Sequence, residues 1–154
     1  MSLSFYNLIP CCSVCNHLKS NNPAKFFSPY DYTKTSNELL KFSVRIKGIN
    51  YLDEIKDLSL NLTIDKDFHN NANTFSLSEI YSKHLDLVQE ILKKKHIYND
   101  DYIKQMFQDY GGLIVNNKGD LINLILSSFI LEEELHKRPF AKLTKDIWEE
   151  VQAI

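Results

Sequence analysis

A group of three cysteines near the N-terminus is the part of this 154-residue sequence whose residue types and spacing could do chemistry. Two residues separate Cys12 from Cys15, a spacing that lets both thiolates reach one tetrahedral zinc ion at about 2.3 Å. A structural zinc site normally has four ligands, and the sequence holds no second Cys-x-x-Cys and no histidine pair at zinc-finger spacing. The spacing therefore predicts half of a zinc site, completed from elsewhere, or three thiols that hold no metal.

The residues around these cysteines resemble the second half of the ββα-metal motif of HNH endonucleases. From Asn7 to Lys19 the sequence reads Asn-Leu-Ile-Pro-x-Cys-x-x-Cys-Asn-x-x-Lys. The resemblance implies that Cys12 and Cys15 belong to a four-cysteine zinc knuckle that binds structural Zn²⁺. Residues 25–31 and 136–147 also look like segments of bacterial HNH proteins of retron- or restriction-associated defence against phage.

The same resemblance assigns roles to single residues. Asn7 takes the place of the middle Asn, which braces the loop that carries the catalytic histidine. Asn16 takes the final position, a ligand of the catalytic divalent cation, Mg²⁺ or another, with His17 as the alternative ligand. Lys19 matches a trailing lysine that offers a point charge to a DNA phosphate.

The family hydrolyses phosphodiester bonds in DNA, with a metal to neutralise charge on the phosphate and a histidine as general base. In the family that histidine and the first Cys-x-x-Cys precede the middle Asn, whereas the six residues before Asn7 contain no His, Asp or Cys. We therefore expect the C-terminal part of an HNH nuclease, with the missing half supplied by an upstream segment or a partner subunit. Whether the chain itself is an enzyme stays open.

Two other interpretations are compatible with these residues. The chain could be a noncatalytic module that binds nucleic acid or protein, or a truncated fragment with a purely structural character. A basic cluster near the C-terminus, to which Arg138 and Lys142 belong together with Lys137 and Lys145, could touch DNA phosphates. The alternative is that this cluster is an ordinary solvated face.

Alternating apolar residues predict two strands, over residues 42–47 and 58–65, that pair in an antiparallel manner. Residues 65–74 are then expected to form a polar loop.

Four helices are expected after it. A capping box at Ser76 predicts a helix of about five turns, and Asn99 and Gly111 delimit a second. Residues 121–134 predict the most buried helix, and Thr144 caps a last helix whose Trp148 anchors the core.

The predicted fold is α+β, with a partial ββα-metal region and loop over 1–38 and, over 39–154, a strand pair followed by a helical bundle. A formal charge of -2 excludes a strongly basic nucleic-acid coat. No signal peptide or membrane-spanning stretch is visible, and adjacent cysteines suit disulfides poorly, so we expect a cytoplasmic protein without a membrane partner.

Overall fold

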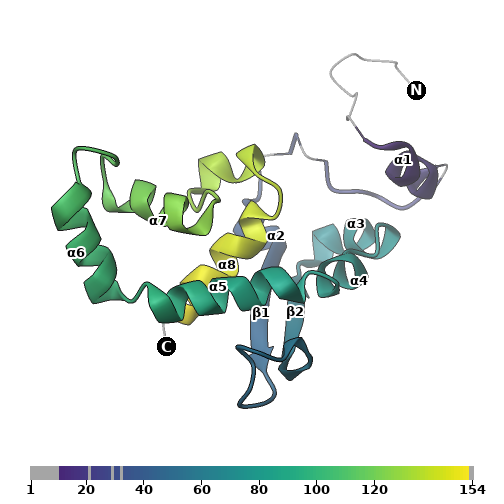
Figure 1. Cartoon of the computed structure of the whole chain (residues 1–154). Coiled ribbons are helices and arrows are strands. Elements are labelled where there is room, and N and C mark those ends of the chain that lie inside the picture. Colours follow the sequence, from purple (N-terminus) through teal and green to yellow (C-terminus); the bar gives the residue numbers. More distant parts are fainter. Residues whose placement is uncertain (1–10, 21, 29, 32, 153–154) are drawn as a thin grey trace.

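The computed structural model describes residues 11–20, 22–28, 30–31 and 33–152, which form a mostly helical α+β fold with one two-stranded antiparallel sheet (Figure 1). The α+β class and the antiparallel strand pair are thus confirmed, whereas the partial ββα-metal region stays a prediction. The elements, in chain order, are α1 (Ser13–Lys19), α2 (Ser36–Leu39), β1 (Leu40–Ile46), η2 (Ile55–Asp57), β2 (Leu58–Ile64), η3 (Lys66–Phe68), α3 (His69–Thr74), α4 (Leu77–Ser82), α5 (Leu85–Ile97), α6 (Asp100–Tyr110), α7 (Lys118–Leu126), η4 (Glu132–Lys137) and α8 (Ala141–Gln152).

β1 and β2 form a two-faced ribbon. Their register runs from Leu40 opposite Ile64 to Ile46 opposite Leu58, so the two sets of alternating apolar residues share one face. On that face Phe42 and Leu58 are fully buried in the main core. α8 packs against β1, and α4 and α5 pack against β2, so helices cover the apolar face of the ribbon (Figure 1).

The outer edge of β1 is closed by a helix instead of a third strand. The backbone N–H of Phe42 donates to Asp146 Oδ2 at 2.9 Å, and that of Val44 donates to Glu150 Oε2 at 2.8 Å. Two strand residues span about 6.6 Å and four helical residues about 6 Å, so one turn of α8 matches the spacing of the two N–H groups. These carboxylates satisfy an edge that would otherwise be open to another chain.

The helical half packs around the same core. α5 crosses α8, and α6 packs on α7. Trp148 is 1% exposed, which confirms it as a core residue, and Asn99 caps α6 by accepting the Tyr102 N–H at 2.9 Å, with Gly111 at the other end, as predicted. The buried apolar cluster consists of Phe42, Leu58, Val88, Ile91, Leu92, Ile103, Val115, Leu121, Ile122, Leu126, Leu143, Ile147 and Trp148.

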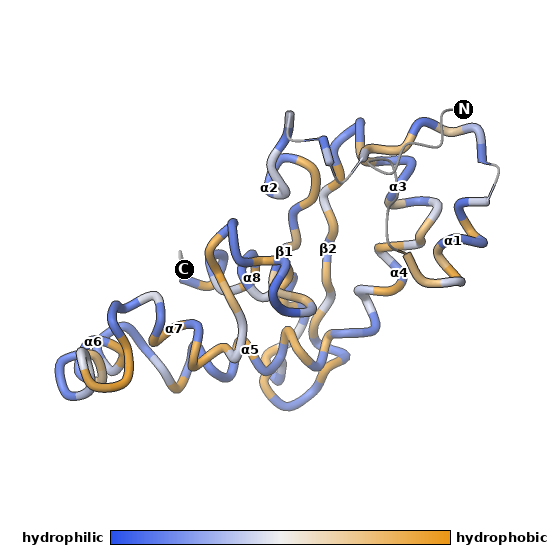
Figure 2. The backbone as a smooth tube through the Cα atoms, turned by 90° about the horizontal axis from the view of Figure 1, so that it is seen from above, coloured by the Kyte–Doolittle hydropathy of each residue, from blue (hydrophilic) through white to orange (hydrophobic). Residues whose placement is uncertain are grey.

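The molecule is elongated, with α1 and α6 at opposite ends in both views (Figures 1 and 2). Among the described residues, no helix has the length and apolar character that crossing a membrane requires.

Residues 66–74 are helical, so the prediction of a loop over 65–74 was wrong. Asp65 accepts the Asp67 N–H at 3.0 Å and thereby starts η3, which leads directly into α3. Ala72 on α3 is buried. The high content of Asn and Asp favoured a loop in the sequence, and tertiary contacts outweigh that local preference.

The helix predicted from Ser76 was also wrong in its details. Ser76 has a left-handed φ of 49° and makes no side-chain cap, and the helical stretch breaks between α4 and α5 at Lys83 and His84. Phe75, which precedes Ser76, contacts the ring of Phe26 at a centroid distance of 6.2 Å. A contact with a distant segment thus forms at the point where a local helix start was predicted.

The segment 121–134 is not the most buried helix. α7 ends at Leu126, where Ser127 takes a left-handed φ of 54°, and Leu124 is 61% exposed. Asn123 stabilises the turn after α7 through two hydrogen bonds. Its backbone carbonyl accepts the Ser128 N–H, and its side-chain oxygen accepts the Ile130 N–H.

The last helix starts four residues earlier than predicted. Thr144 is not a cap, because α8 begins at Ala141 and Thr144 is buried within it. Phe140, with a left-handed φ of 57°, precedes the helix and accepts the Thr144 N–H at 2.9 Å. α8 is thus the most buried helix of the described part of the chain.

We predict that Asp146→Ala lowers the free energy of unfolding by about 3 to 5 kcal/mol. The change removes the acceptor of the Phe42 N–H and leaves the little-exposed Lys142 ammonium, 2.5 Å from Asp146 Oδ1, without its carboxylate. Urea unfolding measures the loss. Glu149→Ala, at a 59% exposed side chain of the same helix, is the control and should change stability by less than about 0.5 kcal/mol. Equal effects of the two changes would show that the edge contact is unimportant.

Candidate functional site

The predicted zinc ligands come together at the start of α1. Cys12 is the N-cap of this helix, and its Sγ accepts the Cys15 backbone N–H at 3.3 Å. The thiols therefore lie within one helical turn, with Cys12 and Cys11 exposed and Cys15 half-buried, and all three are free. Two accessible sulfurs on one turn fit half of a tetrahedral zinc site.

The two thiols differ in acidity because they share a hydrogen bond. The backbone N–H and then the thiol of Cys15 donate to the Cys12 sulfur, which lowers the Cys12 pKa. The pKa of Cys15 is raised, chiefly because its own thiol proton is held in that hydrogen bond. Cys12 is therefore the first of the pair to become a thiolate, the form that binds metal.

The other predicted site residues of this segment follow on the same helix. Asn16 is exposed, its backbone carbonyl accepts the Ser20 N–H at 2.8 Å, and it lies one turn before Lys19. His17 is exposed beside it. Asn7, the predicted brace of the catalytic loop, lies outside the described residues, so the structure does not place it relative to Asn16.

The segment after α1 is held by α3 through side-chain amides. The Asn71 side chain makes two hydrogen bonds to the backbone of Phe27. Its Oδ1 accepts the Phe27 N–H at 2.8 Å, and its Nδ2 donates to the Phe27 carbonyl at 3.0 Å. Asn70 Nδ2 donates to the Lys25 carbonyl at 2.8 Å. The side-chain amides of Asn70 and Asn71 thus bond backbone groups of Lys25 and Phe27, as the backbone of a neighbouring strand would.

Aromatic contacts join α1 to the same anchor. Lys19 Nζ lies 5.6 Å from the ring centroid of Phe26, and Phe26 contacts Phe75. Phe27 meets Phe68 edge to face at 6.5 Å. This anchor was not predicted from the sequence, because residues 65–74 were expected to form a polar loop. The adjacent Asn70 and Asn71, shortly after Phe68, were the feature of the sequence that could have indicated it.

The described residues contain no group of three or more His, Cys, Asp or Glu side chains that could hold a metal ion. Cys12 and Cys15 thus supply at most two ligands of the predicted zinc site, and Asn16 one ligand of the predicted catalytic site.

The basic cluster near the C-terminus is not a uniform solvated face. Lys142 Nζ bonds both oxygens of Asp146, at 2.5 and 2.7 Å, and Asn37 Oδ1 at 2.8 Å. Lys145 is buried and pairs with Glu132 at 2.7 Å. Both lysines have their charge balanced inside the protein, which leaves little of it for a phosphate.

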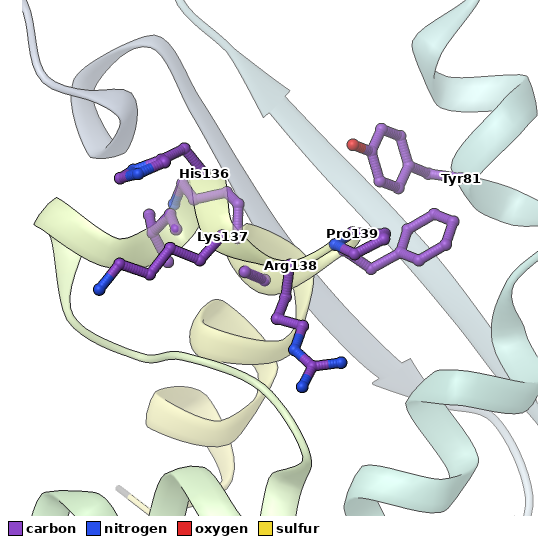
Figure 3. Close-up of a pocket in the computed structure, with 9 residues that line it drawn as sticks. Tyr81, His136, Lys137, Arg138 and Pro139 are labelled. Atoms are coloured by element: carbon purple, nitrogen blue, oxygen red, sulfur yellow. The ribbon is translucent and has the colours of Figure 1, made fainter.

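Arg138 is exposed, and no ion pair engages it within the described part of the chain. It lines an open pocket of about 420 Å³ between η4, the start of α8 and Tyr81. Figure 3 shows that the side chains of His136, Lys137 and Arg138 spread apart and do not converge on the pocket. Lys137 is paired with Glu134 at 2.6 Å, so within the described part of the chain Arg138 is the cation of the cluster that no ion pair engages.

Comparisons with protein-family models, with curated proteins and with solved structures give no match to this chain.

The shared hydrogen bond predicts an order of thiol reactivity. In metal-free protein near neutral pH, iodoacetamide should modify Cys12 before Cys15, because a lower pKa gives a larger thiolate fraction. The preference should shrink as the pH rises above both pKa values. Fragmentation mass spectrometry of briefly alkylated protein reads the positions, and preferential modification of Cys15 would contradict the geometry.

The two hydrogen bonds between Asn71 and the Phe27 backbone predict that Asn71→Ala loosens residues 22–28 and α1 without unfolding the core. Amide hydrogen exchange at Phe27 should rise by at least about tenfold, since two hydrogen bonds are lost. Asn73→Ala, an exposed position on the same helix, is the matched control and should leave that exchange unchanged.

Proposed function

We propose that this chain is the C-terminal part of an HNH-type, metal-dependent endonuclease that hydrolyses DNA phosphodiesters. The observation that supports it best is the arrangement on α1. Cys12 and Cys15 meet at its first turn, and Asn16 and Lys19 follow one turn apart in the order of the ββα-metal motif.

In this proposal Cys12 and Cys15 hold structural zinc with a second cysteine pair from an upstream segment or a partner subunit. Asn16 is a ligand of the catalytic divalent cation, which when bound neutralises charge on the scissile phosphate. Lys19 contacts a neighbouring phosphate as a point charge, and Phe26 below its ammonium limits its movement. Arg138, the residue after η4, contacts the DNA backbone, whereas Lys142 is paired with Asp146.

An apolar stripe on α1 supports the need for a second half. Val14 is 65% exposed and Leu18 is 49% exposed, and at a spacing of four residues they lie on the same side of the helix. In a ββα arrangement this side would pack on the hairpin. The proposed upstream half therefore has an apolar surface to cover as well as a metal site to complete.

The proposal is tested by supplying that half. A fusion that places an HNH-type hairpin with Cys-x-x-Cys and Asp-His before Asn7 should nick supercoiled plasmid in the presence of Mg²⁺ or Mn²⁺. Nicking should fall by at least about a hundredfold with Asn16→Ala or with the added histidine changed to Ala. His17→Ala, which alters the exposed neighbour, should leave most of the activity.

Zinc supplies an independent readout in the same fusion. Bound Zn²⁺ should protect Cys12 and Cys15, but not Cys11, from alkylation. DNA binding without nicking would favour the noncatalytic module. A fusion that takes up zinc but neither binds nor cuts DNA would overturn the nuclease proposal.

A further inference from the structure

The solvent face of the β1–β2 ribbon carries only polar and basic side chains. The register places Lys41 opposite Thr63, Ser43 opposite Asn61 and Arg45 opposite Ser59, on the face away from Phe42 and Leu58. None of the six is buried. The face contains two cations, four neutral hydrogen-bonding groups and no carboxylate.

Lys47 extends the basic row beyond the end of β1. Its N–H donates to the Asp57 carbonyl at 2.7 Å, which continues the ladder, and alternation puts Lys47 on the side of Arg45. The row from Lys41 to Lys47 is about 20 Å long at about 3.3 Å per residue. No ion pair engages its three cations within the described part of the chain.

The acidic residues near the two ends of the ribbon are largely engaged. Asp65 and Asp67 pair with Lys34 at 2.6 and 2.5 Å, and Glu54 pairs with Lys56. Asp57, which the continued ladder places opposite Lys47, accepts the Asn50 N–H at 3.2 Å, and Asp53 in the connection between the strands is exposed. The Lys47 end of the row therefore has carboxylates nearby, whereas Lys41 and Arg45 face only neutral side chains across the ribbon.

We infer that this face, named here the ribbon face and formed by Lys41, Ser43, Arg45, Lys47, Ser59, Asn61 and Thr63, binds the sugar-phosphate backbone of duplex DNA. The inference rests on the proposed function for the choice of DNA over other polyanions. Phosphate oxygens accept hydrogen bonds from lysine, arginine, serine, threonine and asparagine, which are the residue types present here. A two-stranded ribbon is also narrow enough to lie along the major groove of B-form DNA.

The apolar side of the ribbon makes this surface rigid. Phe42 and Leu58 fix one side in the core, and α8 holds the outer edge of β1 through Asp146 and Glu150. The cations therefore project from a backbone that needs no ordering on binding, which reduces the entropic cost of association.

The test compares two variants with the same change in charge. Lys41→Ala, Arg45→Ala and Lys47→Ala together alter the ribbon face. Lys93→Ala, Lys104→Ala and Lys118→Ala together remove three exposed lysines from α5, α6 and α7. Anisotropy of a labelled DNA duplex, titrated with the chain in the presence of a chelator, measures binding without cleavage.

The ribbon variant should bind at least about tenfold more weakly than the wild type. The negative slope of the logarithm of the association constant against the logarithm of the salt concentration should become shallower by about 2 to 3. The control should stay close to wild type. Asn61→Asp, which adds a negative charge to the ribbon face with almost no change of shape, should also weaken binding if the triple variant proves unstable. Equal losses in ribbon and control variants, unchanged binding in both, or a wild-type chain that does not bind the duplex would each overturn the inference.

The same variants separate this inference from the nuclease proposal. If the fusion never nicks DNA and the chain still binds duplex through the ribbon face, the nuclease proposal fails and the ribbon face stands. If the ribbon variant of the fusion nicks as well as wild type at low DNA concentration, the ribbon face is wrong and the nuclease proposal stands. Tight binding of an A-form RNA duplex that does not depend on the ribbon face would indicate a different surface.

Discussion

The contact between α8 and the edge of β1 is the constraint on which the rest of this fold depends. Asp146 and Glu150 lie one turn apart and accept the N–H groups of Phe42 and Val44, two residues apart on the strand. Asp146 also holds Lys142, so one buried carboxylate satisfies a strand amide and a lysine together. Breaking it would leave a buried donor and a buried charge unpaired, which costs far more than an exposed ion pair contributes.

A second group of charges ties the same helix to the segment before β1. Lys145 bonds Glu132 at the start of η4, and Glu132 also accepts the Ser36 hydroxyl of α2. Burial would raise the pKa of Glu132, but the hydrogen bonds from Lys145 and Ser36 outweigh it and lower the pKa. The stabilisation from this carboxylate is therefore present above its unfolded pKa and is lost as the pH falls through the folded value. Acid should loosen α2 and η4 from α8.

Local patterns in the sequence predicted the elements whose boundaries are set locally. Strict alternation identified β1 and β2, and Asn99 with Gly111 delimited α6, because these signals act within a few residues. Two of the errors have different causes. Asn71 reaches Phe27 across 44 positions, which no local pattern indicates. After α7 the cause is nearby, because the Asn123 side chain accepts the Ile130 N–H and an apolar run gives no sign of that turn. For the candidate site, spacing identified Cys12 and Cys15, but the internal pairing of Lys142 and Lys145 was not visible in a run of basic residues.

The same contacts account for the buried charges of the described residues. Lys145 and Asp146 both lie on α8, where Lys145 pairs with Glu132 and Asp146 accepts the Phe42 N–H. The groups to which the two proposals assign a role, namely the thiol pair on α1, the guanidinium of Arg138 and the ribbon face, lie at the surface. Among the described residues, α1 buries no residue of its own, and the segment that follows it is bonded to α3 through Phe27. In the proposed nuclease, a second half that packs on Val14 and Leu18 would fix the position of α1, whereas the ribbon is already fixed by Phe42 and Leu58 in the core. Under that proposal, positioning of the DNA and assembly of the metal site would depend on different parts of the molecule.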